Sequence, residues 1–219
     1  MATSRYLAPH VHAVRIGDDL VFLDVMADSY LCWPSAVALE LSSDGRQLTA
    51  NRPEDLHDLE SAHLLSPSAA SAMFGAIVAE TPTGDLLRVD RAGPPDRAAA
   101  LLRGSFDAAV VYRRARFVDL VRYGADHLAG GQPDAPPSAA LAEVVAGFHR
   151  WACWTPAPAK CLIRSFMLLR RLRRSGHDAR WVFGVRTWPF EAHCWLQAGP
   201  VALDDALERL RGYQPILVV

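Results

Sequence analysis

Residues 158–178 read PAKCLIRSFMLLRRLRRSGHD, residues 179–186 read ARWVFGVR, and residues 190–205 read FEAHCWLQAGPVALDD. Each of the three pieces has the pattern of one kind of secondary-structure element. The first piece has helical spacing of apolar residues, the second has the β-branched and aromatic content of a strand, and the third has alternation on both sides of a turn. The stretch therefore predicts a helix opened by a cysteine, followed by a strand and a hairpin.

The helix is expected to begin at about residues 159–161, because Pro156 and Pro158 are excluded from a helix interior. Gly176 supplies the stop. Its apolar stripe is Leu162, Ile163, Phe166, Leu169 and Leu172. Cys161 then lies in the first turn, at the positive end of the helix dipole, where a thiol loses its proton more easily and becomes a nucleophile. A buried structural cysteine is the alternative, and it fits this position less well.

The hairpin predicts a partner for a histidine. If the hairpin is centred on Gly199, His193 and Asp205 are equally far from the turn and lie opposite each other, with Cβ atoms about 5 Å apart. An aspartate in that position orients an imidazole and stabilises its charged form. A one-residue slip in register would place Asp204 or Ala206 there instead.

These residues resemble the lasso-peptide maturation B proteins, which are transglutaminase-like cysteine proteases. The resemblance covers residues 96–219 and is carried by Cys161 after PAK, by AHCW around His193, and by LDD ending at Asp205. It implies a papain/transglutaminase-like protease domain with a Cys161, His193 and Asp205 triad that removes the leader from a precursor peptide. It also implies a partner, an ATP-dependent asparagine-synthetase-like macrocyclase. Family members often have Asn where this chain has Asp204.

The N-terminal part predicts strands at residues 10–16, 20–26 and 30–33, a helix at residues 35–41, and a second helix after Pro53. This β-β-β-α-α order is that of a small winged helix. The segments GDDLVFLD and SYL, from residue 17 to residue 31, resemble the PqqD-like leader-recognition domain. The predicted fold class is therefore α+β, with a PqqD-like domain at residues 1–82, a linker at 83–95 and the protease domain at 96–219. Within the last, further helices are expected at 97–128 and 139–151.

The resemblance implies that an extended leader adds a strand to the third strand of this domain, so that main-chain bonds supply affinity and side-chain pockets supply selectivity. The expected receiving edge is Tyr30, Leu31, Cys32 and Trp33, with Leu56, Leu59 and His63 lining a groove. The alternative is that some of these residues are only the core of a small domain. A DNA-binding winged helix is disfavoured, because the second helix, RPEDLHDLE, is acidic.

Composition excludes several classes. Hydrophobic residues make up 51% and charged residues 21% of the 219 residues, which predicts a globular protein, and a net charge of −1 gives no electrostatic argument for binding to nucleic acid or membrane. No signal peptide and no apolar run of about 18 residues is visible, so a cytoplasmic location is expected. No cofactor motif is present. A zinc site built from His149, Cys153, Cys161 and Cys194 lacks the usual ligand spacing.

The expected activity is therefore that of a cysteine endopeptidase acting through an acyl-enzyme. Two alternatives remain open at this point. One is a transglutaminase-like acyltransferase that uses the same residues with an amine acceptor. The other is a catalytically inactive peptide-binding protein.

Overall fold

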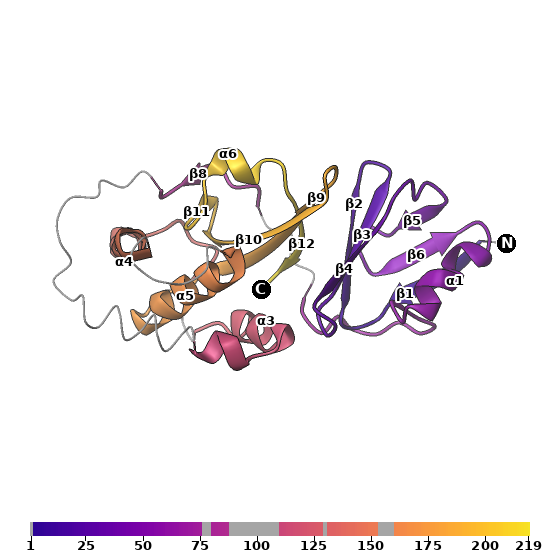
Figure 1. Ribbon diagram of the computed structural model, residues 1–219, viewed down its shortest axis with the longest axis horizontal. Coiled ribbons are helices and arrows are strands. Elements are labelled where there is room, and N and C mark those ends of the chain that lie inside the picture. Colours follow the sequence, from indigo (N-terminus) through magenta and orange to yellow (C-terminus); the bar gives the residue numbers. More distant parts are fainter. Residues whose placement is uncertain (1, 76–79, 88–109, 129–130, 153–159) are drawn as a thin grey trace. The chain divides into compact units, whose positions relative to one another are not determined.

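The computed structural model describes residues 2–75, 80–87, 110–128, 131–152 and 160–219 (Figure 1). The chain forms two compact units. The first consists of residues 1–78, 184–192 and 214–219, and the second of residues 79–183 and 193–213.

In its described residues, the N-terminal part of the first unit contains two antiparallel sheets and one helix. The four-stranded sheet has the order β5-β6-β1-β7 and is made of β1 (Thr3–Leu7), β5 (Leu39–Leu41), β6 (Gln47–Ala50) and β7 (Leu65–Ser66). The three-stranded sheet is the meander β2 (Val11–Ile16), β3 (Asp19–Asp24) and β4 (Ser29–Trp33). Helix α1 spans Glu54–Ser61. The core between these elements includes Leu7, Phe22, Leu48, Leu56 and Leu59.

The predicted three-strand meander and the helix after Pro53 are confirmed, whereas the predicted helix at residues 35–41 is wrong. Leu39–Leu41 forms β5, which pairs with β6 in antiparallel register. The residues LEL alternate, so Leu39 faces the core at 3% exposure while Glu40 faces solvent. That period of two outweighs the helix propensity of the preceding alanines.

The β-β-β-α-α order of a winged helix is therefore not the order of this unit. Strand β1 precedes the meander and β6 follows it, and the two pair with each other over residues 3–6 and 47–50. Only one helix, α1, follows the meander among the described residues of the N-terminal part. The α+β class is confirmed at the coarser level, as a mixed structure.

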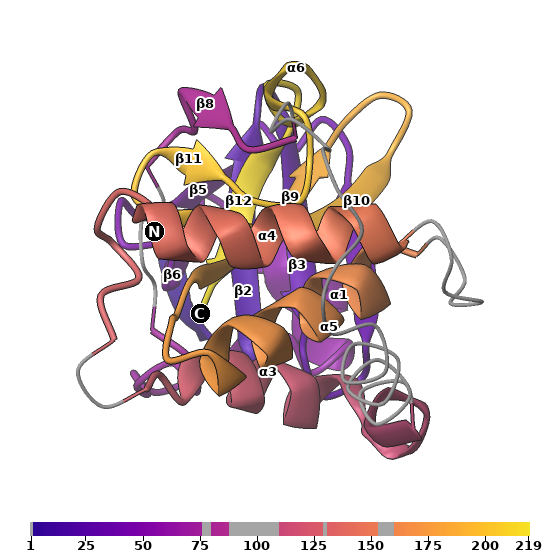
Figure 2. The same ribbon diagram turned by 90° about the vertical axis from the view of Figure 1, so that its left-hand side faces the viewer.

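The second unit supplies the helices that accompany a five-stranded sheet of order β12-β9-β10-β11-β8. The strands of this sheet are β8 (Gly84–Asp85), β9 (Arg180–Arg186), β10 (Glu191–Ala198), β11 (Val201–Ala202) and β12 (Gln214–Val218). Of these, β12 and parts of β9 and β10 belong to the first unit, and the other strand residues belong to the second unit. Its helices are α3 (Phe117–Ala125), α4 (Ala139–Ala152), α5 (Cys161–Arg174) and α6 (Leu207–Leu210). Figure 2 shows α4 and α5 side by side, on the same face of β9 and β10.

Aromatic packing fixes α5 against the sheet. Phe166 on α5 stacks on Trp181 of β9 with ring centroids 6.1 Å apart, and Trp181 contacts Phe183 at 5.1 Å. All three side chains are at most 2% exposed. Burying an aromatic ring of this size stabilises a fold by about 1.5–3 kcal/mol, so this contact holds the start of α5 in place over the sheet.

The expected helices of the second unit are found where the structure describes them. Residues 97–109 of the predicted 97–128 segment lie outside the described residues, and α3 lies within its remainder. The predicted 139–151 helix is α4. The expected linker at residues 83–95 is not wholly a linker, because Gly84–Asp85 pairs in parallel with β11 as an edge strand of the sheet. Residues 88–95 lie outside the described residues.

Candidate active site

Cys161 is the first residue of α5, as its position after the two prolines predicts. Lys160 before it has an extended backbone, with φ −76° and ψ 130°, so the helix starts abruptly at the cysteine. The first N–H groups of a helix have no partner inside it and carry partial positive charge. The Cys161 side chain is partly exposed, so a thiolate formed there is both stabilised and accessible.

His193 lies on β10, with its side chain facing inward and 5% of the residue exposed. Two aromatic rings hold the imidazole. Trp195 is stacked at a centroid distance of 6.3 Å, and Tyr213 lies at 5.3 Å. The ring is therefore confined to one orientation, in which Nε2 faces Asp205.

Asp205 accepts a hydrogen bond from His193 Nε2 through Oδ2, and its Oδ1 accepts one from the N–H of Ala206 at 2.8 Å. Arg164 and Arg209 each place a guanidinium nitrogen 3.8 Å from Oδ2. Burial raises the pKa of Asp205, but the bonds from His193 and Ala206 and the charges of His193 and Arg164 outweigh it, so the pKa is lowered overall. Asp205 is therefore a carboxylate.

The predicted contact between His193 and Asp205 forms, but the predicted register is wrong. Gln197 pairs with Ala202 and Ala198 with Val201, so the hairpin is centred between Gly199 and Pro200. That ladder, if continued, would place Ala206 opposite His193. Strand β11 instead ends at Ala202, and Asp205 reaches the imidazole from the segment that follows.

The thiol and the imidazole form a charged pair. Hydrogen bonds from the Cys194 thiol, from His193 and from the Cys194 N–H bring the pKa of Cys161 down to about 4, against burial, which raises it. Burial lowers the pKa of His193, but its bonds to Asp205 and Cys161 outweigh this and raise it to about 9. Between these limits the sulfur is a thiolate and the ring is an imidazolium. Since Nε2 faces Asp205, the ring nitrogen left for the thiolate is Nδ1.

Sequence reasoning missed three neighbours of this pair. The first is Cys194, whose buried thiol stays protonated because burial raises its pKa, so that it donates to the Cys161 sulfur. The others are Arg164, three residues after the cysteine on α5, and Arg209, four residues after Asp205. The i+3 spacing from Cys161 within the predicted helix is a signal that could have found Arg164, whereas Asp205 lies outside a helix and no helical spacing connects it to Arg209.

Asp204 lies apart from the imidazole. Its side chain is buried, with Oδ2 accepting from Ser165 Oγ at 2.6 Å and Oδ1 accepting from the Leu196 N–H at 2.8 Å. Burial raises its pKa. Of the two aspartates that the sequence offers as partners of His193, the structure therefore brings Asp205 to the ring.

The expected leader-binding residues lie partly on β4 and partly on or just after α1. Strand β4 contains Tyr30, Leu31, Cys32 and Trp33. It is an edge of its three-stranded sheet, and Leu31 is 40% exposed. The Tyr30 ring lies 6.0 Å from that of Phe190. His63 is exposed after α1.

Leu56 and Leu59 are not groove residues, which corrects the sequence-based expectation. Their exposed fractions are 1% and 0%, and both belong to the core that packs β1, β3 and β6. For these two leucines the alternative stated from the sequence holds, because they are core residues covered by the protein's own sheets.

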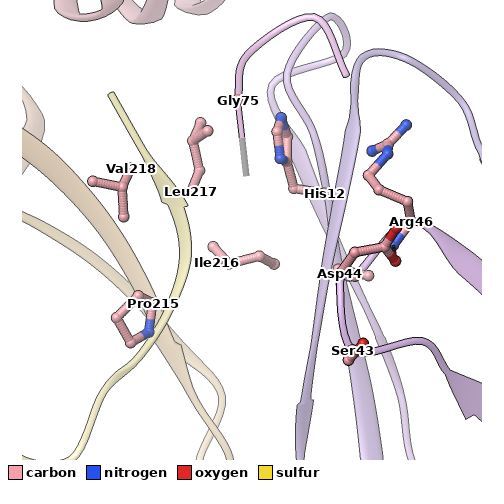
Figure 3. Close-up of a pocket in the computed structure, with 11 residues that line it drawn as sticks. His12, Ser43, Asp44, Arg46, Gly75, Pro215, Ile216, Leu217 and Val218 are labelled. Atoms are coloured by element: carbon pink, nitrogen blue, oxygen red, sulfur yellow. Dashed lines mark hydrogen bonds between the residues drawn. The ribbon is translucent and has the colours of Figure 1, made fainter. Parts of the chain in front are cut away.

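A separate pocket of about 180 Å³ lies in the first unit, between the β2 side chains and β12 (Figure 3). Its walls are residues 12–13, 43–46, 75 and 215–218. His12 in this wall is 4% exposed, and burial together with Arg46 lowers its pKa to about 4, so the ring is neutral. Cys161 is not among the lining residues, so this pocket is not the site of thiol chemistry.

No cluster of three or more His, Cys, Asp or Glu side chains suited to a metal ion occurs in the part of the chain that the structure describes. Cys153, one member of the conceivable zinc set, lies outside that part. None of the described helices is long and apolar enough to cross a membrane.

Comparison with known proteins gives two matches. The family profile of the transglutaminase-like superfamily matches residues 102–218, a range that contains the candidate thiol, imidazole and carboxylate. The chain is also 44% identical over 46 residues to the microcin J25-processing protein McjB of Escherichia coli, a match that covers 21% of this chain and 22% of that protein. The match thus spans about a fifth of the relative's length. No solved structure matches the chain.

Proposed function

Because the chain belongs to the transglutaminase-like superfamily, we propose that it is a cysteine endopeptidase that cuts the leader from a lasso-peptide precursor. The observation that carries this proposal is the thiol at the start of α5, next to an imidazole that is itself held by a carboxylate. The resemblance to lasso-peptide B proteins and the partial similarity to a protein named for processing microcin J25 supply the substrate class.

The proposed chemistry starts from the thiolate of Cys161, which attacks the carbonyl carbon of the scissile bond. The Nδ1 proton of His193 passes to the leaving amine as the C–N bond breaks, which leaves a thioester. Neutral His193 then takes a proton from water, the hydroxide attacks the thioester, and the thiolate leaves. Asp205 keeps the ring oriented and stabilises its charged form in both steps.

The tetrahedral intermediate carries a negative oxygen that needs hydrogen-bond donors. The backbone N–H of Cys161 is suited to this role, since it belongs to the first turn of α5 and has no helical acceptor. The partial positive charge at the helix start adds to this stabilisation.

The test is cleavage of the precursor peptide encoded by a short reading frame next to this gene, followed by mass spectrometry. The wild-type protein should release a leader ending in a free carboxylate, and Cys161→Ala should release none while still binding the leader. Cleavage by Cys161→Ala would contradict the assignment. A product joined to an added amine would instead show acyl transfer, the chemistry of a transglutaminase.

We further propose that the edge strand β4 receives the leader as an added strand. An edge strand presents unpaired N–H and C=O groups, which an extended peptide can satisfy. The 40% exposed Leu31 lies in the middle of this strand and offers apolar contact. Ring closure of the core is assigned to a separate ATP-dependent asparagine-synthetase-like macrocyclase.

The variant Leu31→Asp tests this part, with Val37→Asp as the matched control. Val37 is also an apolar side chain, 74% exposed, but lies outside β4. We expect Leu31→Asp to raise KM for the precursor about tenfold with kcat unchanged, because the loss of one apolar contact is on the order of 1.4 kcal/mol. Val37→Asp should leave KM as it is. Equal effects of the two variants would exclude β4 as the receiving strand.

A further inference from the structure

Asp204 connects the two elements that carry the reacting groups. Its Oδ2 accepts from Ser165 Oγ at 2.6 Å, and Ser165 lies four residues after Cys161 on α5. Its Oδ1 accepts from the Leu196 N–H at 2.8 Å, and Leu196 lies three residues after His193 on β10. One buried side chain therefore links the thiol's helix to the imidazole's strand.

The sheet alone does not fix the position of Asp205. The ladder between β10 and β11 ends at Ala202, and the last main-chain bond of the hairpin runs from the Leu203 N–H to the Leu196 carbonyl at 2.8 Å. Beyond it, the Leu196 N–H bonds to the side chain of Asp204 rather than to the neighbouring main chain. The path of the chain into Asp205 is thus set by Asp204.

Two further contacts hold the same segment. Arg164 donates to the main-chain carbonyl of Asp204 and lies 3.8 Å from Asp205 Oδ2. His149 Nε2 lies 2.8 Å from the carbonyl of Leu203. The segment is therefore anchored on both sides of Asp204, and the carboxylate of Asp205 is held toward His193.

We propose that Asp204 is a positioning residue whose hydrogen-bond pattern, and not its charge, sets the bond between Asp205 and His193. This inference rests on the proposed function only in that the positioned groups are taken to catalyse precursor cleavage. An amide at position 204 can make both bonds, since its oxygen accepts from the Leu196 N–H and its NH₂ donates to the Ser165 hydroxyl, which also accepts. An amide at position 205 still accepts from His193 Nε2 through its oxygen, but it removes the negative charge that Oδ2 places beside an imidazolium and two guanidinium groups.

The experiment compares Asp204→Asn, Asp204→Ala and Asp205→Asn by the pH dependence of Cys161 alkylation with iodoacetamide. This readout requires no precursor, so it decides the inference even if the proposed substrate is wrong. We expect Asp204→Asn to retain the wild-type midpoint. Asp204→Ala and Asp205→Asn should both shift the midpoint toward higher pH, because an imidazolium that is no longer held by Asp205 stabilises the thiolate less.

Cleavage of the precursor gives a second readout for the folded variants. Asp204→Ala should lower kcat by about 10²-fold with KM unchanged, since a misplacement of about 1 Å has an effect of that order. Asp204→Asn should keep most of the wild-type kcat. A purely structural role would lower the amount of folded protein without moving the alkylation midpoint.

Ser165→Ala tests the same link if Asp204→Ala does not fold. It removes the hydroxyl oxygen with its bond to Asp204 Oδ2 and its longer contact of 3.4 Å to the Cys194 carbonyl, and should shift the midpoint in the same direction by a smaller amount. The proposal is overturned if Asp204→Asn shifts the midpoint of Cys161 alkylation as far as Asp205→Asn does. It is also overturned if Asp204→Ala, or Ser165→Ala in its place, folds and keeps the wild-type midpoint.

Discussion

Among the described residues of the second unit, two His–Asp pairs, one buried and one partly buried, differ in what faces the other ring nitrogen of the histidine. In one, His193 bonds to Asp205, and the ring's other partner is the thiol of Cys161. In the other, His127 Nδ1 lies 3.0 Å from Asp178 Oδ2, and Arg180 Nη1 lies 2.8 Å from Nε2. A guanidinium can only donate, so it fixes His127 with Nε2 as acceptor and Nδ1–H as donor.

The carboxylates differ in the same way. Asp178 accepts four N–H bonds, from His127, from the Leu128 and Ala179 main chain, and from Arg173 at 3.0 Å. These bonds lower its pKa to about 2 although burial raises it. The pair at His127 is saturated and connects α5, β9 and the segment after α3, whereas the pair at His193 has a ring nitrogen facing a nucleophile. A histidine with both ring nitrogens bonded to charged structural groups indicates a structural role, whereas a histidine with one ring nitrogen facing a thiol is suited to proton transfer.

The largest expected effect separates the two histidines. His193→Ala should lower kcat/KM for precursor cleavage by about 10⁴-fold or more, because removing one member of a triad costs most of its contribution. His127→Ala, assayed on folded protein, should stay within about threefold of wild type. Rates measured side by side on the same precursor check this, and similar losses in both variants would remove the distinction.

Which parts of this arrangement could be predicted from sequence depends on the range of the interactions. The start of α5 at Cys161 follows from Pro156, Pro158 and the helical stripe, all of which act locally. The contact between His193 and Asp205 could be predicted as a pair, since only a short hairpin separates them. The geometry of this contact could not be predicted, because the turn is centred between Gly199 and Pro200 instead of on Gly199 and the chain leaves the ladder after Ala202.

The rest depends on tertiary packing. His127 and Asp178 are 51 residues apart, and no local pattern connects them. Leu56 and Leu59 were expected to line a ligand groove, but the same apolar side chains suit a core, and only the sheets that cover them decide between the two. Within the segment predicted as a helix at residues 35–41, Leu39–Leu41 forms a strand because β6 is available to pair with it.

A smaller effect, on stability, is expected for the pair formed by His127 and Asp178. Asp178→Asn should lower the free energy of unfolding by about 3–5 kcal/mol, because the new NH₂ faces N–H donors and leaves Arg173 buried without its carboxylate. Cleavage per folded molecule should be retained. Urea unfolding followed by circular dichroism measures the difference from wild type.

The difference in the free energy of unfolding between wild type and Asp178→Asn should depend on pH, because the pKa of Asp178 is lowered in the folded protein. A group whose pKa is depressed in the folded state contributes stability that is present above its unfolded pKa and is lost as the pH falls through the folded value. The gap between wild type and Asp178→Asn should therefore be widest above about pH 4 and narrow toward about pH 2. A gap that stays constant down to pH 3 and below would mean that the ionised carboxylate is not what the four donors stabilise.

The smallest expected effect concerns the thiol on the reactive side. With the pKa of Cys161 near 4 and that of His193 near 9, the alkylation rate of Cys161 should be nearly flat from pH 5.5 to pH 8. An ordinary thiol with a pKa of about 8.5 gains roughly 10²-fold in thiolate over that range. Cys32, whose pKa is raised by burial and by Asp19, provides the internal control and should show the steep dependence. Peptide mapping after iodoacetamide labelling resolves the two sites, and a steep profile at Cys161 would mean that His193 and Asp205 do not activate it, which would reduce the open pair to a second structural one.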